Sequence, residues 1–452
     1  MVITGIGAVT PLGTGMVPTW ERLVAGRSAL GPITALDPSG FPSRLGGQVG
    51  ELPTKDHMPK AYRKAIKVMA RDTEIAVVAA RLAVDDARLS TRFHADTSQA
   101  APTYPADRFA CQIGAGLIAA DTAELAAAMA TAVDPAAPPQ TRDRTGGFSL
   151  RAWGTEDGGG GGMNNLPPLW MLKYLPNMLA CHVSIIHGCE GPSNTHTCGE
   201  ASGLLSLGES ARVIERGNAD AAIAGGAESK LNLTGLLRLC GAGHLAPTDG
   251  HSTGSDVIRP FDPASPGTLM SEGGALLVLE GQDAANARGA RVYATLAGFG
   301  AAQSSSAALH RGSGTDASAK ALASAIRSAL RDAALTSADI DAVVPQGCGV
   351  PAFDRAEADA LAEVFGLRLA SLPAVTLTPF MGNLYAGHAS VQAAVAAWCL
   401  HTQTLPARLH AGTPAKVRAE QVASAPASLR AVLVTCQSIA GQCAAMVVTR
   451  PE

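Results

Sequence analysis

Apolar residues occur in two kinds of run along most of the chain. Short continuous runs are bounded by glycine or polar turns, and in longer stretches the apolar residues recur every three or four positions. The short runs at residues 2–6 and 109–113 predict buried strands. The longer stretches at residues 60–89 and 318–333 predict amphipathic helices. Strands that alternate with helices in this way are typical of α/β folds, in which helices cover mostly parallel sheets.

The order of these elements occurs twice. Each half has a strand, a helix, a strand that ends in a glycine-rich turn, a second helix and a pair of strands, without close repetition of residues. We therefore expect an N-terminal half over residues 1–280 and a C-terminal half over residues 281–452. Residues 133–166 hold several prolines and a run of five glycines at 158–162, which predicts a flexible surface loop or a lid over a pocket.

Composition narrows the class of protein. Hydrophobic residues make up 47% of the chain and charged residues 16%, as in a well-buried globular protein, and a net charge of −3 indicates no basic footprint for nucleic acid. Nine cysteines form no CxxC pair, so we expect reduced thiols in a cytoplasmic protein and no metal site. No apolar run is long enough to span a membrane, and the first residues lack the features of a signal peptide.

The opening sequence GIGAVTPLG also bears on cofactors. Its glycine spacing differs from that of a dinucleotide-binding fingerprint, and Pro11 interrupts the pattern. We therefore expect no nucleotide cofactor, and no other cofactor is indicated.

Residues 191–229 contain the feature around which the chain is organised. A strand of small residues leads into a tight turn at residues 197–199, and an amphipathic helix follows over about residues 201–216. Backbone N–H groups and the helix dipole act on a side chain at such a helix start, where an acyl-transfer enzyme places its nucleophile. The residue at this position is Glu200, and a carboxylate is a poor nucleophile for acyl transfer.

Six segments in order along the chain carry a family resemblance. They are VITGIGAVTPLG (2–13), GPSNTHTC (191–198), SGLLSLGESARVIERGNADAAIAGGAES (202–229), RPFDPASPG (259–267), SEGGALLVLE (271–280) and RGARVYATLAGFG (288–300). Together they resemble the β-ketoacyl-acyl-carrier-protein synthases of the fatty-acid type, which have the thiolase fold. The resemblance implies a five-layered αβαβα fold of two similar halves and a dimer paired across the strand at about residues 191–197.

Condensation in this family needs a cysteine nucleophile, two histidines and a lysine. The resemblance assigns the cysteine position to Glu200, the two histidine positions to Gln346 and Asn383, and the lysine position to Thr378. The gate position, a phenylalanine in the family, is Ile439. All four chemical groups are absent, while the glycines and helices around them are kept. Without the histidine pair, nothing obvious assists the loss of CO₂ from a malonyl unit.

The same pattern is similar to the chain-length factors of type II polyketide synthases, which lack the cysteine and pair with an active ketosynthase. Residues 349–366 and 382–390 also resemble those factors, although they commonly carry glutamine where this chain has Glu200. The resemblance implies a non-condensing subunit that shapes the acyl tunnel in fatty-acid or polyketide biosynthesis. Its implied partners are a ketosynthase and an acyl carrier protein.

Two other functions remain open at this stage: an enzyme that acts on acyl thioesters through Glu200, and a homodimeric protein that binds an acyl chain or a carrier protein. Glu200 could fill a vestigial pocket, carry new chemistry, or form a salt bridge at the dimer interface. Cys198 is either a displaced nucleophile or a packing residue. His196 and His244 are either partners for Glu200 or ordinary hydrogen-bonded histidines. Glu272 matches a carboxylate that the family keeps near the site, and we expect it to hold a turn.

Overall fold

The computed structural model describes residues 1–98, 100–133, 147–154, 161–304, 315–410, 417 and 423–451. Much of the loop expected over residues 133–166, including most of its glycine run, lies outside these residues. The described part of that segment contains two short helices, Leu150–Gly154 and Gly162–Asn165.

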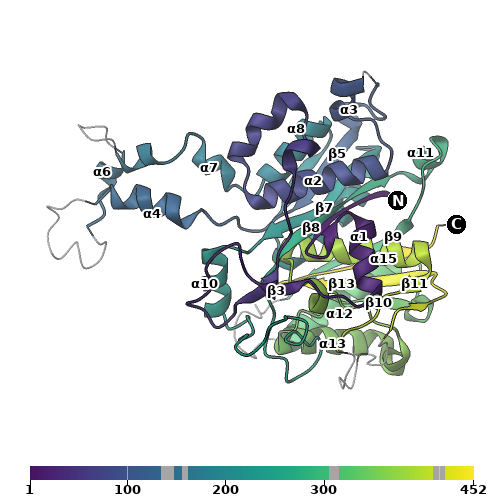
Figure 1. Ribbon diagram of the computed structural model, residues 1–452. Helices are drawn as coiled ribbons and strands as arrows, with labels where there is room; N and C mark the ends of the chain where they lie inside the picture. The colour runs from purple at the N-terminus through teal and green to yellow at the C-terminus, as the bar shows by residue number, and fades with distance from the viewer. Residues whose placement is uncertain are drawn as a thin grey trace.

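Five layers of helix and sheet make up the body of the molecule (Figure 1). Helix α2 (Arg71–Asp86) covers the outer face of the first group of strands, and α12 (Thr315–Asp332) covers the outer face of the second. Helices α9 (Ser202–Glu215) and α15 (His388–Thr402) lie between the two groups and pack on both. The largest buried apolar cluster fills this central layer, and two further clusters lie under the outer helices. The five-layered arrangement expected from the sequence is thus confirmed.

Four strands follow the same order in each half, and the first half has β6 as an additional edge strand. In each half one strand, β8 or β14, is antiparallel to both of its neighbours. The sheet therefore contains both parallel and antiparallel pairings and is mixed, where the sequence predicted mostly parallel sheets. A short pairing of Val2 with Thr295 and Ile3 with Ala294 joins the two groups. The first group is β6 (Ser193–His196), β5 (Phe109–Gly114), β7 (Ala221–Ser229), β8 (Glu272–Glu280) and β1 (Val2–Thr10), and the second is β9 (Ala294–Gln303), β14 (Gln442–Thr449), β13 (Ala431–Gln437) and β10 (Ala342–Val344).

The remaining elements are short or peripheral. The strands are β2 (Gly13–Thr14), β3 (Leu30–Pro32), β4 (Leu45–Gly47), β11 (Thr404–Leu405) and β12 (Ala425–Pro426). The α-helices are α1 (Met16–Val24), α3 (Arg92–Ser98), α4 (Thr122–Ala130), α6 (Leu150–Gly154), α7 (Trp170–Lys173), α8 (Met178–His187), α10 (Leu233–Gly241), α11 (Gln282–Ala287), α13 (Pro351–Phe365) and α14 (Thr378–Met381). The 3₁₀ helices are η1 (Thr54–His57), η2 (Lys60–Val68), η3 (Ala106–Arg108), η4 (Gly162–Asn165), η5 (Gly199–Ala201), η6 (Ser337–Asp339), η7 (Gly366–Ser371) and η8 (Tyr385–Gly387).

The helix predicted over residues 60–89 is two elements. Residues Lys60–Val68 form the 3₁₀ helix η2, and α2 begins at Arg71 after two residues of extended backbone. A 3₁₀ helix has three residues per turn, and its partly buried residues Tyr62, Ala65 and Val68 recur at that spacing. The prediction of one helix was wrong because apolar spacings of three and four were read together as one α-helical face.

Close packing of helix on strand depends on glycine pairs at equivalent places in the two halves. A methyl group at Gly5 or Gly7 of β1 would overlap carbonyl oxygens of α2. A methyl group at Gly298 or Gly300 of β9 would overlap carbonyl oxygens of α12 in the same way. The sequences GIGA (5–8) and GFGA (298–301) therefore both allow a helix to pack closely on a strand. They form a short repeat between the two halves that the sequence analysis missed.

None of the helices in the described ranges is long and apolar enough to cross a membrane.

We expect Gly7→Ala to lower the free energy of unfolding by about 1–3 kcal/mol, because the added methyl group forces α2 away from β1. Gly300→Ala should act similarly through α12. Gly31→Ala is the control, since a methyl group there meets no atom within 4 Å. Chemical denaturation of the purified variants measures the effect, and equal stability of the Gly7 and Gly31 variants would contradict the proposed packing.

Candidate active site

The turn before α9 is built as the sequence predicts. Strand β6 ends at His196, Gly199 adopts a left-handed conformation with φ of 58°, and Glu200 lies in the single turn η5 that leads into α9. The Ser202 hydroxyl fixes this turn, since it accepts the N–H of Cys198 at 2.8 Å and donates to the carbonyl of Gly199 at 2.6 Å. Glu200 therefore occupies a position defined by the backbone.

The Glu200 carboxylate faces the C-terminal turn that carries the gate position. The backbone N–H of Ile439 donates to Glu200 Oε2 at a long 3.4 Å. Burial raises the pKa of Glu200, and the nearby Glu228 carboxylate adds to this rise, while Lys230 opposes it. The side chain thus turns toward the backbone of the C-terminal turn.

A narrow cavity brings most of the predicted site residues together. Its volume of about 20 Å³ corresponds to roughly one or two water molecules, far less than an acyl thioester needs. Of the residues singled out in the sequence, Thr378, Cys198, His196 and Glu272 do not line it. The lining residues are Glu200, Leu239, His244, Thr268, Gln346, Cys348, Val350, Phe353, Asn383, Tyr385, Gln437 and Ile439.

Gln346 and Asn383, which the sequence analysis expects at the two histidine positions, use their side chains to hold backbone groups. Gln346 Oε1 accepts the N–H of Gln437 at 3.0 Å. Asn383 Oδ1 accepts the N–H of Tyr385 at 2.9 Å and so fixes its own turn. Thr378, expected at the lysine position, is buried and donates from its hydroxyl to the carbonyl of Gly347 at 2.5 Å. None of these three side chains supplies a charge to the cavity.

Two buried carboxylates of α13 hold the turn that contains Gln346. Glu357 accepts the N–H groups of Gln346 and Gly347, both at 2.9 Å. Asp354 accepts the N–H of Gly349 and also that of Phe261 at 2.8 Å. Burial raises the pKa of Glu357 to about 7 and that of Asp354 to about 6. The sequence analysis did not identify them, although their three-residue spacing on the buried face of a helix was a signal.

Tyr385 and His388 are further residues of this region that the sequence analysis did not single out. Tyr385 has a φ of 49°, lines the cavity, and has a pKa raised by burial and by the Glu200 and Glu228 carboxylates. His388 is fully buried at the start of α15, and burial lowers its pKa to about 4. The imidazole is therefore neutral and enclosed, which makes it unsuited to exchanging protons with a ligand.

Cys198 and His196 lie outside the cavity, whereas His244 lines it. Cys198 does not line the cavity, and burial raises the pKa of its thiol, so the thiol is not activated as a nucleophile. His196 Nε2 lies 3.3 Å from Gln112 Oε1, and burial lowers its pKa. His244 lines the cavity and packs edge-on against Phe353 with ring centroids 5.6 Å apart. No hydrogen bond between Glu200 and a histidine occurs among the described residues.

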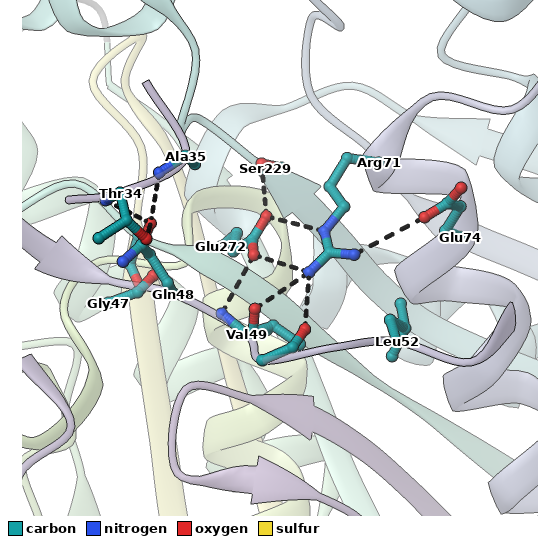
Figure 2. Close-up of polar contacts among 12 residues, drawn as sticks. Thr34, Ala35, Gly47, Gln48, Val49, Leu52, Arg71, Glu74, Ser229 and Glu272 are labelled. Carbon is teal, nitrogen blue, oxygen red and sulfur yellow. Dashed lines mark hydrogen bonds and ion pairs between the residues drawn. The ribbon is translucent and has the colours of Figure 1, made fainter. Parts of the chain in front are cut away.

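Glu272 belongs to a separate polar cluster, shown in Figure 2. Its carboxylate accepts two hydrogen bonds from Arg71, at 3.0 and 3.2 Å, and others from Val49 N–H and the Ser229 hydroxyl. The neighbouring Ser271 hydroxyl donates to carbonyl oxygens of Gly47 and Met381, so the start of β8 is tied to the turn before Asn383. The contacts of Glu272 are those of a structural clamp.

The chemistry available in the cavity is limited. It contains a carboxyl group with a raised pKa, neutral amides, the His244 imidazole, whose pKa burial lowers, and two groups whose pKa burial raises strongly, the Tyr385 phenol and the Cys348 thiol. In the part of the chain that the structure describes, no three His, Cys, Asp or Glu side chains are arranged to hold a metal ion. An activated nucleophile and a charged group to stabilise an oxyanion or enolate are both missing from the described lining.

Two family sequence profiles match the chain. The profile described as "Beta-ketoacyl synthase, N-terminal domain" matches residues 1–141 and 147–285, and that described as "Beta-ketoacyl synthase, C-terminal domain" matches residues 293–412. A relative from Streptomyces glaucescens, named "Tetracenomycin polyketide synthase ketoacyl synthase beta subunit", is 31% identical and covers 100% of this chain and 98% of its own. A "3-oxoacyl-acyl-carrier-protein synthase 2" from Staphylococcus aureus is 28% identical over 91% of each chain.

Solved structures share the fold over the whole chain. "The ishigamide ketosynthase/chain length factor" superposes with a TM-score of 0.78 and 24% identity, covering 100% of this chain and 99% of that one. A ketosynthase in complex with a type II polyketide synthase acyl-carrier protein superposes with a TM-score of 0.80 and 20% identity at the same coverage. These likenesses confirm the thiolase-like fold expected from the sequence.

The carboxylate clamp of α13 predicts a pH dependence of stability. A carboxyl group whose pKa is raised in the folded state stabilises the fold below its unfolded pKa, and this contribution is lost as the pH rises through the folded value. For Glu357 this stabilising contribution is lost between about pH 4.5, the ordinary pKa of the group, and about pH 7, its pKa in the folded state. Since Gln does not titrate, the stability of the wild type relative to Glu357→Gln should fall between pH 5 and pH 8.

Urea denaturation at several pH values measures this difference. Glu363→Gln is the control on the same helix, because Glu363 forms an exposed ion pair with Arg327 and its removal should give a difference that stays nearly constant over the same range. If the free energy of unfolding of the wild type, relative to that of Glu357→Gln, rises with pH over this range, the assignment of the buried carboxylate is wrong.

Proposed function

The chain belongs to the β-ketoacyl synthase family, and from this we propose that it is a non-condensing subunit, similar to a chain-length factor, that pairs with a cysteine-bearing ketosynthase. The observation that carries the proposal is the replacement of four chemical groups at once, at Glu200, Gln346, Asn383 and Thr378, within an intact fold. A cavity of about 20 Å³ leaves no room for an acyl group beside Glu200.

The contacts of these four residues favour a structural role over new chemistry. Glu200 turns toward the N–H of Ile439, and the side chains of Gln346, Asn383 and Thr378 each hydrogen-bond a backbone group. A repurposed acyl-transfer enzyme would need a free carboxylate and space for a thioester. We therefore favour the interpretation in which Glu200 fills the former pocket.

The edge of the first sheet supports pairing with a second chain. Strand β6 is the last strand of its group, and no other described strand pairs with its outer side. Edge strands are templates for pairing with another chain.

A projecting arm is a second feature that fits a partner chain. Helices α4, α6 and α7 form this arm in Figure 1, and most of the exposed large apolar residues lie between positions 117 and 185. A partner that covers both features would bury this apolar surface.

The relatives support the biosynthetic context. The Streptomyces relative is named as the beta subunit of a polyketide synthase, and one solved structure of the same fold holds an acyl-carrier protein on its ketosynthase. We propose polyketide or fatty-acid biosynthesis in the cytoplasm, with an acyl carrier protein as the second partner. Residues of this chain near the shared interface would then shape the tunnel for the growing chain.

Co-expression of this chain with a ketosynthase whose gene lies beside its own should yield a one-to-one heterodimer. Size-exclusion chromatography and native mass spectrometry measure the result. An affinity tag on the ketosynthase alone allows homodimers of this chain and heterodimers to be counted separately. Recovery of self-pairs alone would contradict the subunit assignment and favour the homodimeric acyl-binding alternative.

We also expect Glu200→Cys to give no condensing activity in this chain, because the histidine and lysine positions hold Gln346, Asn383 and Thr378. Assay of the purified variant with acyl and malonyl thioesters measures this.

Glu200→Gln in the heterodimer should leave product formation within about twofold of wild type, since Glu200 takes part in no proton or acyl transfer. Replacing the partner's nucleophilic cysteine by alanine is the control and should abolish the product. Loss of product on Glu200→Gln with the heterodimer intact would favour the alternative of chemistry at Glu200.

A further inference from the structure

We propose that a cavity between α3, the last turn of α8 and the start of β5 binds a small neutral aromatic molecule that carries a hydroxyl group. The three elements lie together at the top of Figure 1. The cavity, called the His187 cavity below, has a volume of about 260 Å³ and shares no lining residue with the cavity near Glu200. Its lining residues Arg92 and Pro102 are exposed, so the cavity opens to solvent. This inference goes beyond the proposed function and does not depend on it.

Three segments of the first half form the walls of the His187 cavity. Thr91 lies in the link between α2 and α3, and His187 is the last residue of α8. Phe109, the first residue of β5, belongs to the third segment together with Tyr104. The Tyr104 hydroxyl donates to Glu280 of β8, so this wall is tied to the sheet. The walls are therefore in place before a ligand arrives, which lowers the entropy cost of binding.

His187 has one ring nitrogen with a partner and one without. Its Nδ1 lies 3.1 Å from the Thr91 hydroxyl. Its Nε2 is buried and has no hydrogen-bond partner among the residues that the structure describes. Burial, together with Arg81 and His94, lowers the pKa of His187 to about 3, so the imidazole is neutral at physiological pH. A ring nitrogen that is shielded from water without a partner destabilises the fold, and a ligand that supplies the missing hydrogen bond removes this penalty.

A hydroxyl group is the ligand group that fits Nε2 best. Neutral imidazole carries its proton on one nitrogen, and the Thr91 hydroxyl can either donate to Nδ1 of His187 or accept from it. Nε2 is therefore an acceptor in one tautomer and a donor in the other. A hydroxyl group both donates and accepts, so it pairs with Nε2 in either tautomer, whereas an ammonium group only donates and a carbonyl group only accepts.

The charges around the His187 cavity favour a neutral ligand. The one charged side chain in its described lining is that of Arg92, and this guanidinium forms an ion pair with Glu190. A ligand carboxylate would therefore have to compete with Glu190. No Asp or Glu residue is part of the described lining, so a cationic ligand would find no counter-charge there.

The apolar part of the lining favours an aromatic ring. The rings of Tyr104 and Phe109 have centroids 6.5 Å apart and an angle of 34° between their planes. Leu89, Ala95 and Pro102 add aliphatic surface. Aromatic rings pack on such surfaces in offset or edge-on arrangements. Since an apolar cavity of about 150 Å³ takes benzene, the 260 Å³ of the His187 cavity are enough for a ring with a hydroxyl group and a short substituent.

The test is isothermal titration calorimetry of the full-length chain with three probes that share one ring: 4-ethylphenol, ethylbenzene and 4-ethylbenzoate. The phenol should bind with a dissociation constant below about 1 mM, and at least about threefold more tightly than ethylbenzene, because only the phenol supplies a partner for His187 Nε2. The benzoate should bind at least about threefold more weakly than the phenol, because Arg92 is already paired with Glu190.

Two variants and a control locate the binding site. His187→Phe keeps a flat ring and removes both nitrogens, so the preference for 4-ethylphenol over ethylbenzene should disappear. Ala95→Leu places a larger side chain in the cavity wall and should weaken binding of both probes at least about tenfold. The matched control is Ala287→Leu, which makes the same change at an exposed position of α11 and should stay within about twofold of wild type. Unfolding midpoints show whether each variant is folded.

Four results would overturn the proposal: no binding of 4-ethylphenol to the wild type, equal affinity for 4-ethylphenol and ethylbenzene, tighter binding of 4-ethylbenzoate, or unchanged 4-ethylphenol binding by Ala95→Leu. The first three need only the wild-type chain, so they decide the matter even where a variant fails to fold. The result is also separate from the pairing experiment, because the probes report on this cavity whether the chain forms homodimers or heterodimers.

Discussion

The architecture depends on how closely two helices approach two strands. Gly5 and Gly7 of β1 let α2 lie against the strand backbone, and Gly298 and Gly300 of β9 do the same for α12. These contacts set the spacing of the outer layers, and the central helices α9 and α15 are then held between two groups of strands with the same order. The turns around the vestigial cavity gather at this centre, contributed by both halves of the chain.

The turns around Glu200 are held by contacts to their backbone. Backbone N–H groups of the Gln346 turn are held by carboxylates of α13, and the turn before Asn383 is held through Ser271. These supports differ from the residues expected at the family's chemical positions, Glu200, Gln346, Asn383 and Thr378. They keep the turns in place whichever side chains the turns present, because they bind the backbone.

Much of the fold and the composition of the cavity could be predicted from the sequence, since glycines, turns and the order of elements record the backbone. Glu200, Gln346 and Asn383 were expected together and do line one cavity. The supports Asp354 and Glu357 were missed because a buried carboxylate on a helix looks like an exposed one until its partners are known. The 3₁₀ geometry of η2 was missed because its apolar residues at spacings of three and four also satisfy an α-helical pattern.

The hydrogen bonds of four cavity-region residues also bear on how freely these positions can change. Asn383 supports the backbone of its own turn, Gln346 holds the N–H of Gln437, and Thr378 holds the carbonyl of Gly347, while Glu200 turns toward Ile439. Three of these contacts join segments that lie far apart in the sequence. A substitution at one of the four positions therefore changes how separate segments are held together, so tolerance to mutation at these positions is coupled to folding as well as to function.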